Sequence, residues 1–215
     1  MKKLCCVIAI IVMIMGCACA DGVSTKQWQH EAGWVGFQLA LSQEQLDSVW
    51  EESVKVFGKN MGLKGLTVEQ MKKMLLQGYS MESGVDELNV EGNRITGRKA
   101  DGTEVFSHKY AWVETIKDKK IMGGKAVHVF RTKEKGAKNY TYLLMMEPVK
   151  TEGKNAEYTT FNLICTGKKD YKALFNTKKN GSAVIPCTMI KKDTGTEGLT
   201  YAIERLFKSS AVIRK

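Results

Sequence analysis

Hydrophobic and polar residues repeat with two different periods along this chain. In two stretches, 42–58 and 67–78, the apolar residues recur at the three-to-four spacing of an amphipathic helix. Each stretch begins with a capping box and ends with a glycine, which are common helix boundaries, so the pattern predicts two helices. The boundary residues are Ser42 with Gln45 before Gly58, and Thr67 with Gln70 before Gly78.

After the second helix the period changes to that of β-strands. Segments rich in β-branched and aromatic residues follow one another, with Gly, Asn, Asp and Lys at the breaks, as in an antiparallel meander. The predicted strands are 85–90, 94–96, 103–116, 125–132, 139–146 and 158–166.

Further elements lie on either side of this meander. An alternating run at 33–39 predicts one more strand ahead of the helices, and Val184 with Ile185 indicates a short late strand. Apolar residues from Leu199 to Phe207 predict a C-terminal helix. A sheet of this size tends to close because closure removes exposed edges. The sequence therefore predicts a mainly β fold, an antiparallel barrel of about seven or eight strands with a helical insert and a C-terminal helix.

The N-terminus has the features of an export signal. Lys2 and Lys3 precede an apolar run at 4–15, which is too short for the roughly 20 residues of a membrane span. Small residues ending in Ala20 then form an Ala-x-Ala cleavage pattern. We therefore divide the chain into a signal peptide (1–20), a flexible lead-in (21–33) and one barrel domain (34–215), with no transmembrane span in the mature protein.

Cysteine positions support an exported protein and leave two questions open. Four of the six cysteines lie in the leader, so cleavage after Ala20 leaves Cys165 and Cys187. In an oxidising compartment these two could form a disulfide, or they could be two separate buried thiols. A loose lipobox offers another alternative, in which the protein is a lipoprotein anchored to a membrane through Cys17 or Cys19.

Composition and charge exclude several classes of protein. Hydrophobic residues make up 43% and charged residues 26% of the 215 residues, which are ordinary proportions for one globular domain. The formal net charge is +10, but the lysines lie in short clusters between apolar runs and arginines are few. This pattern is typical of solvated turns rather than of a nucleic-acid surface, so we expect no nucleic-acid partner.

Several short motifs follow one another along the predicted elements. They are Trp34-Val35-Gly36, Gly78-Tyr79, Lys109-Tyr110, Tyr140-x-Tyr142 and Glu147-Pro148. Together with the order of the elements, these motifs resemble the ZinT/YodA family of periplasmic metal-binding proteins. The resemblance covers roughly 34–189 and implies a calycin, lipocalin-like barrel that binds zinc or cadmium in the periplasm without catalytic turnover.

The chain departs from this family at the metal ligands. The family holds its metal at one mouth of the barrel with three imidazoles, one late in a strand and two in a His-x-His pair on the next. Here Met146 or Glu147 falls near the first position, and Thr160 and Asn162 occupy the pair. Threonine and asparagine are poor zinc ligands. No family ligand carries over, and we assign no metal-binding residue.

The remaining chemistry-bearing residues give no other site. His30, His108 and His128 each lack a second ligand at suitable spacing, and alternation predicts His128 as an interior, hydrogen-bonded residue. Met145 and Met146 are adjacent and so face opposite sides of a strand, which favours core packing over copper(I) binding.

The sequence predicts no catalytic residue. Glu147 and Glu157 could be imagined as an acid and base pair, but the chain has no nucleophile elbow, phosphate loop or mature Cys-x-x-Cys motif. We therefore expect a protein that is not an enzyme.

The sequence as a whole predicts an exported, monomeric protein that binds zinc or another divalent metal ion non-catalytically, with the usual metal site degenerate. The alternative is a barrel that binds a small apolar or anionic ligand, or an envelope-anchored interaction module. The missing His-x-His pair is the feature that separates these hypotheses.

Overall fold

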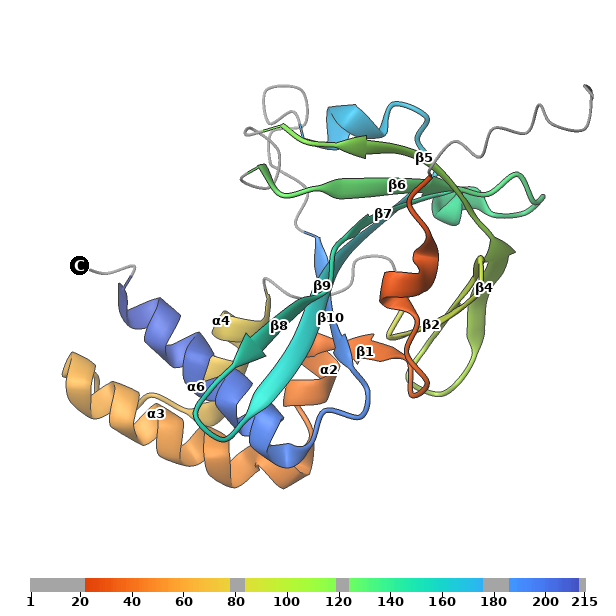
Figure 1. The fold of residues 1–215 in the computed structure, drawn as a ribbon. Coiled ribbons are helices and arrows are strands. Elements are labelled where there is room, and N and C mark those ends of the chain that lie inside the picture. The colour runs from red at the N-terminus through yellow and green to blue at the C-terminus, as the bar shows by residue number, and fades with distance from the viewer. Residues whose placement is uncertain (1–21, 78–83, 119–123, 176–185, 213–215) are drawn as a thin grey trace, which may run out of the picture.

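The structure is a computed structural model that describes residues 22–77, 84–118, 124–175 and 186–212. Antiparallel strands form most of it, and helices gather at one side (Figure 1). The strands are β1 (Trp34–Gly36), β2 (Glu87–Glu91), β3 (Arg94–Arg98), β4 (Glu104–Lys109), β5 (Ala111–Ile116), β6 (Val127–Arg131), β7 (Tyr142–Met146), β8 (Val149–Glu152), β9 (Glu157–Thr166) and β10 (Cys187–Lys191). The helices are α2 (Phe37–Leu41), α3 (Asp47–Met61), α4 (Val68–Leu76) and α6 (Thr196–Val212), with short 3-10 helices η1 (Thr25–Trp28), η2 (Glu44–Leu46), η5 (Lys138–Tyr140) and η6 (Tyr171–Phe175).

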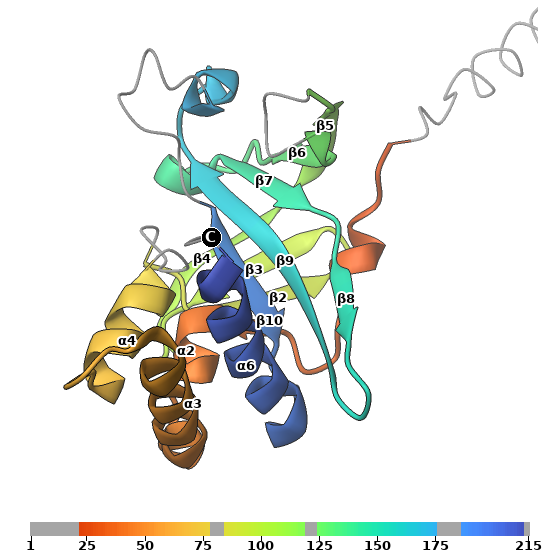
Figure 2. The ribbon, with the colours of Figure 1, turned by 90° about the vertical axis from the view of Figure 1, so that its left-hand side faces the viewer.

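The strands form one antiparallel sheet in the order β4-β3-β2-β1-β10-β9-β7-β6-β5, and β8 pairs with β9 beside this path. β4 and β5 lie at the two ends of this order, yet only Tyr110 separates them in the chain. The sheet therefore curls into a nearly closed barrel (Figures 1 and 2). The predicted antiparallel, calycin-like barrel is confirmed. Among the described residues it has nine strands rather than seven or eight, with β8 beside it.

Large apolar side chains fill the barrel interior. One buried cluster draws its members from β1, β2, β3, β4, β6, β7, β9 and β10. Trp28 from η1 and Trp34 from β1 lie in this cluster, 0% and 1% exposed. Their indole N–H groups donate to the carbonyls of Met146 and Trp28, at 2.8 and 2.7 Å, so burial leaves neither polar group unsatisfied. The barrel interior is therefore a packed core.

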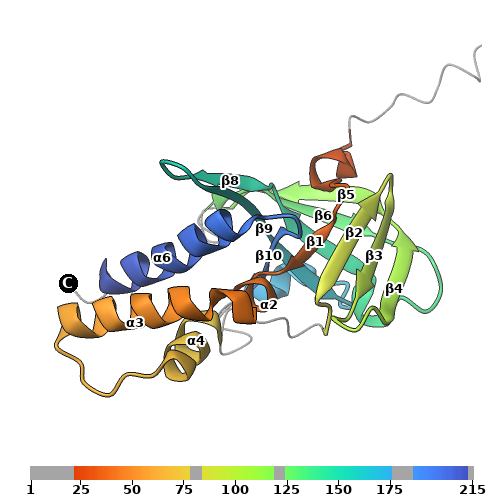
Figure 3. The same ribbon diagram turned by 90° about the horizontal axis from the view of Figure 1, so that it is seen from below.

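The helices cover the outer face of the sheet beside β1 and β10 (Figure 3). Val35 of β1 and Ile190 of β10 join the helical side chains in a second buried cluster. Within it, Phe207 of α6 packs edge-on against Trp50 and Phe57 of α3, with ring centroids 5.7 and 5.5 Å apart. These contacts fix α6 beside the sheet.

The run 33–39, predicted as one strand, is a three-residue strand followed by helix α2. Phe37, Ala40 and Leu41 are buried at helical spacing in the cluster with the other helices. Leu39, which would share a strand face with Phe37, is 38% exposed. Alternation over so short a run does not distinguish a strand from a helix, and contact with the other helices decides the outcome.

The predicted helix 42–58 begins and ends later than its sequence pattern indicates. Ser42 does not cap it, because Ser42 closes α2 with its N–H, and α3 starts at Asp47. The helix continues past Gly58 and ends before Gly62, whose φ of +64° favours a residue without a side chain. The helix was predicted correctly, but its capping box was wrong.

The capping box of the second helix is confirmed. The Thr67 hydroxyl accepts from the N–H of Gln70 at 3.2 Å, and the Gln70 side chain accepts from the N–H of Thr67 at 3.0 Å. Helix α4 ends at Leu76, and Gly78 lies outside the described residues.

The predicted strand 103–116 is divided into β4 and β5 at Tyr110, because the two halves pair with different neighbours, β3 and β6. The Tyr110 phenol donates to the carbonyl of Tyr140 at 2.6 Å, which holds this corner of the barrel. Strand β8 was not predicted, since it is short and mostly exposed. The strand predicted around Val184 and Ile185 falls outside the described residues.

The lead-in to the domain lies against the barrel. The structure describes it from residue 22 onward. The Thr25 hydroxyl donates to the carbonyl of Gly92, and Trp28 is buried in the barrel core. The division of the chain at residues 20 and 33, and the flexibility of the lead-in, stay predictions. No helix in the described ranges is long and apolar enough to cross a membrane.

The two mature cysteines lie on neighbouring strands. Cys187 of β10 is buried in the barrel core, and Cys165 of β9 packs against the same cluster. Leu163 is the cross-strand partner of Cys187, so Cys165 lies one diagonal step away. The described part of the chain shows no disulfide bond between them. The bridge therefore stays a prediction.

Candidate functional site

A cavity of about 410 Å³ lies between α6, the end of β7 and strands β8 to β10. We call it the α6 cavity. Its volume falls within the range of about 300–1,000 Å³ that is usual for small-molecule sites. Its polar lining residues are Lys125, Glu147, Thr151, Tyr158, Thr160, Asn162, Thr188 and Arg205.

Strand alternation directs polar side chains into the α6 cavity. On β9, Phe161 and Leu163 belong to the barrel core, so Thr160 and Asn162 point to the opposite, outer face. On β10 the same alternation turns Thr188 outward. The two positions at which the ZinT resemblance places a His-x-His pair do share a face, as predicted. That face lies outside the barrel core and towards α6.

Asn162 is held by both ends of its amide. Its Oδ1 accepts from the Thr188 hydroxyl at 2.8 Å, and its Nδ2 lies 3.7 Å from the sulfur of Met146. A thioether accepts hydrogen bonds weakly and cannot donate, so the nitrogen rather than the oxygen faces Met146. The oxygen of Asn162 is thus already engaged, and its N–H₂ group keeps donor capacity.

His128 lies beside the α6 cavity, on the core side of β6. Its side chain is 5% exposed, with Nδ1 2.9 Å from the Thr115 hydroxyl and Nε2 3.3 Å from Oε1 of Glu147. Trp112 donates its indole N–H to the same hydroxyl at 3.2 Å, which leaves the hydroxyl proton for Nδ1. In that arrangement Nε2 carries the ring proton and donates to Glu147. The predicted interior, hydrogen-bonded histidine is confirmed.

The other two histidines each meet a different carboxylate. His108 Nδ1 lies 3.1 Å from Oε2 of Glu134, and this hydrogen bond, with a smaller contribution from the N–H of Lys109, lowers the pKa of Glu134. His30 Nε2 lies 3.7 Å from Oδ2 of Asp193. Within the described ranges, no three His, Cys, Asp or Glu side chains come together as a metal site.

The residues at the family's ligand positions do not fit a tetrahedral zinc site. Thr160 and Asn162 offer neither nitrogen nor sulfur ligands, and the Asn162 oxygen is taken by Thr188. Met145 lies in the barrel core and Met146 on the outer face, so the two sulfurs diverge, as predicted for core packing. The potential metal ligands at this end of β7 are the imidazole of His128 and the carboxylate of Glu147.

The two glutamates considered as an acid and base pair have separate partners. Glu147 contacts His128, whereas Glu157 pairs with Lys150 at 2.6 Å across the β8–β9 hairpin. The hydrogen bonds that Lys150 donates to Glu157 and, with a smaller effect, to Glu152 raise the pKa of that lysine. The two carboxylates therefore do not form a pair that could act as acid and base.

Several residues of the α6 cavity were not predicted from the sequence, and Lys125, Thr188 and Arg205 are examples. Lys125 precedes β6, Thr188 lies on β10 and Arg205 lies on α6. They come from segments that are far apart in the chain and share no motif. No signal in the sequence could have joined them, because only the sheet order brings these segments together.

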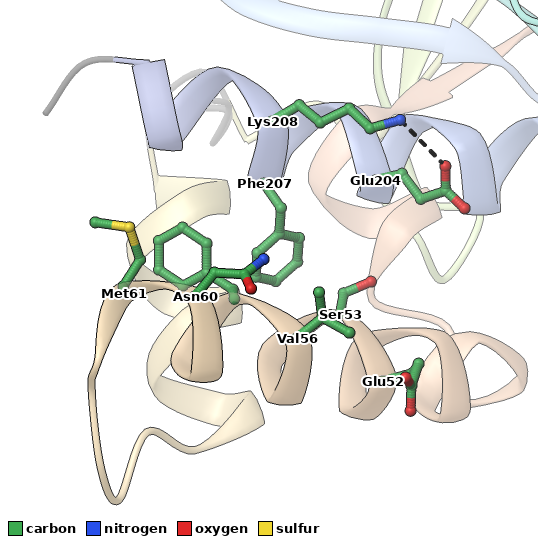
Figure 4. A pocket seen from close by; sticks show the side chains of 9 residues that line it. Glu52, Ser53, Val56, Asn60, Met61, Glu204, Phe207 and Lys208 are labelled. Atoms are coloured by element: carbon green, nitrogen blue, oxygen red, sulfur yellow. Dashed lines mark ion pairs between the residues drawn. The ribbon is translucent and has the colours of Figure 1, made fainter. Parts of the chain in front are cut away.

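A second cavity, of about 400 Å³, lies between α3 and α6 (Figure 4). We call it the α3–α6 groove. Val56, Met61 and Phe207 give it a mainly apolar lining, and Glu204 and Lys208 face each other on its rim, 3.7 Å apart. Its lining includes the hydroxyl of Ser53 and the carboxylate of Glu52, but no histidine or cysteine.

No protein-family model and no curated protein sequence matches this chain. Among solved structures it is similar to the Zn(II)-bound ZinT-like domain of AdcA from Streptococcus pneumoniae, with a TM-score of 0.53 and 16% sequence identity over 90% of this chain and 94% of that domain.

It is also similar to Zn(II)-bound AdcA from the same organism, with a TM-score of 0.52 and 14% identity. That match covers 86% of this chain and 35% of the AdcA chain, so this chain spans about a third of that protein. Sequence identities this low support a shared fold, and they do not identify the binding residues of this chain. The protein has a ZinT-like fold.

Proposed function

We propose that the protein is an exported, non-catalytic binding protein in which zinc or a related divalent ion binds weakly between His128 and Glu147. The observation that carries this proposal is the 3.3 Å contact between His128 Nε2 and Glu147 Oε1 at the end of β7. The two AdcA structures with the same fold contain Zn(II), which supports a divalent ion as the ligand.

The two side chains would hold an ion in place of the proton that they share. Nitrogen and carboxylate oxygen are ordinary zinc ligands, and Glu147 has a 59% exposed side chain, so solvent can reach the pair. Two protein ligands are fewer than a closed zinc site provides, which is why we expect weak binding. Because zinc binds a neutral imidazole and an ionised carboxylate and so competes with protons for both, affinity should rise with pH.

Calorimetric titration of the metal-stripped protein with zinc tests this proposal. We expect one ion per chain with a dissociation constant weaker than about 1 μM, and loss of that binding in Glu147→Gln and His128→Ala. His108→Ala is the matched control, because His108 pairs with a different carboxylate, Glu134. A submicromolar site that survives replacement of both His108 and His128 would contradict the proposal.

Export forms part of the same proposal. The lysine pair, the apolar run at 4–15 and the cleavage pattern ending at Ala20 support a cleaved leader. Protein recovered from the cell envelope should have the intact mass of a chain that begins at Asp21. A mass increased by diacylglycerol on Cys17 or Cys19 would instead support the lipoprotein alternative.

A small-ligand binding module is the second candidate function. The α6 cavity favours it, because the cavity has the volume of a small-molecule site and opens beside Glu147. The packed barrel interior, where Trp28 and Trp34 are buried, supports placing a ligand in the α6 cavity rather than in the barrel.

A further inference from the structure

The α6 cavity has spare hydrogen-bond donors on its lining side chains. The Asn162 oxygen already accepts from Thr188, while its nitrogen has only the weak sulfur acceptor of Met146 at 3.7 Å. The Glu147 carboxylate is engaged by the ring of His128. A ligand in this cavity therefore meets an N–H₂ group that lacks a strong acceptor, beside a carboxylate that already contacts His128.

Two cations border the same cavity. Lys125 and Arg205 line it from two different elements, the segment before β6 and helix α6. Neither forms an ion pair with an acidic side chain of the described residues, whereas Lys150 and Lys192 are paired at 2.6 and 2.7 Å. Both side chains are exposed at the cavity edge, so a ligand arriving from solvent can reach them.

Charge and donor placement point to the same ligand class. Two cations against the single carboxylate of Glu147 favour an anion, and hydrogen bonds from charged donors to carboxylate or phosphate oxygens are stronger than neutral ones. The planar guanidinium of Arg205 suits two oxygens at once. Thr160 adds a hydroxyl from β9.

We infer that the α6 cavity binds a small anion that carries a carboxylate or phosphate group, with Lys125 and Arg205 at its edge and Asn162 and Thr160 donating from β9. This inference rests on the proposed binding function and names a ligand class that differs from the divalent ion at His128. Thr160 and Asn162 occupy the positions that the ZinT resemblance assigns to ligands of a metal cation. In this chain they would bind an anion instead.

Isothermal titration of the purified protein with inorganic phosphate, succinate and citrate, in separate runs at constant ionic strength, tests the inference. We expect at least one of them to bind with one-to-one stoichiometry, and the phosphate and carboxylate runs show which group is preferred. Arg205→Gln and Lys125→Gln should each weaken that binding by about tenfold or more. Far-UV circular dichroism of both variants should match the unmodified protein, because both residues are exposed.

Lys208→Gln is the matched control, since Lys208 lies one turn further along α6 and borders the α3–α6 groove. Its variant should bind the anion as the unmodified protein does. Absence of binding by all three anions, or equal weakening by Lys208→Gln and Arg205→Gln, would overturn the inference. Zinc binding at His128 with no anion binding would leave the proposed function standing, whereas failure of both titrations would overturn both.

Discussion

The two sides of α6 border cavities of nearly equal volume and opposite chemistry. Toward α3, Phe207 and Val56 line the apolar α3–α6 groove of about 400 Å³. Toward the sheet, Arg205 faces the α6 cavity of about 410 Å³ with Asn162 and Thr160 of β9. The two sides of α6 therefore have different roles. One side attaches it to the helical layer, and the other completes a polar site on the sheet.

The difference follows from what each side of α6 faces. Another amphipathic helix presents an apolar stripe, so Phe207 finds Trp50 and Phe57 there and becomes buried. The outer face of β9 presents Thr160 and Asn162 between residues committed to the barrel core. Polar groups on that face stay hydrated or take a ligand, because close apolar packing would leave them unsatisfied.

The largest effect should come from breaking the attachment side of α6. Phe207→Ala removes a ring that is 7% exposed and packs on two aromatic neighbours, so we expect a loss of about 3–5 kcal/mol in the free energy of unfolding. Chemical denaturation followed by circular dichroism measures it.

Val56→Ala is the control on the same groove. Val56 is 47% exposed, so its variant should change stability by no more than about 0.5 kcal/mol. Equal losses for the two variants would mean that the groove as a whole, rather than the buried aromatic contact, holds α6 in place.

A smaller effect should come from the start of α6, where it meets β9. A Cβ at Gly198 would lie 2.4 Å from the carbonyl oxygen of Glu157 and 2.8 Å from Cγ2 of Thr194. Gly198→Ala must therefore push α6 away from the sheet. We expect it to reduce the free energy of unfolding by about 1–3 kcal/mol, and so to lower the melting temperature. Because the shift moves a wall of the α6 cavity, anion affinity should fall as well.

Gly195→Ser provides the matched comparison for that effect. Its Cβ would meet no atom within 4 Å, and serine is favoured just before a helix. Thermal unfolding should show a change of less than about 0.5 kcal/mol. If Gly198→Ala is as mild as this control, the close contact between α6 and β9 does not set the position of the helix.

Sequence patterns were reliable where local signals agree with the tertiary contacts. The Thr67 and Gln70 box lies in an exposed turn, where nothing competes with its hydrogen bonds, and it was predicted correctly. The Ser42 box failed because the preceding residues formed α2 and used Ser42 to close it. The predicted strand 33–39 is correct only at Trp34–Gly36. From Phe37 onward, burial among the helices outweighed the short alternation.

The candidate site divides in a similar way. Alternation along single strands predicted that His128 lies inside and that Thr160 and Asn162 share a face, because side-chain direction on a strand is a local property. It could not show that the shared face points toward α6, or that Glu147 reaches His128, because both depend on how strands and helix are assembled.

The sequence by itself determined the barrel class, the absence of the His-x-His pair and the interior position of His128. These follow from residue identity and the two-residue period of a strand, which need no partner. Only the tertiary structure decided that Lys125, Asn162 and Arg205 border one cavity. They belong to segments that meet through sheet order and helix packing, and such long-range contacts leave no periodic trace in the chain.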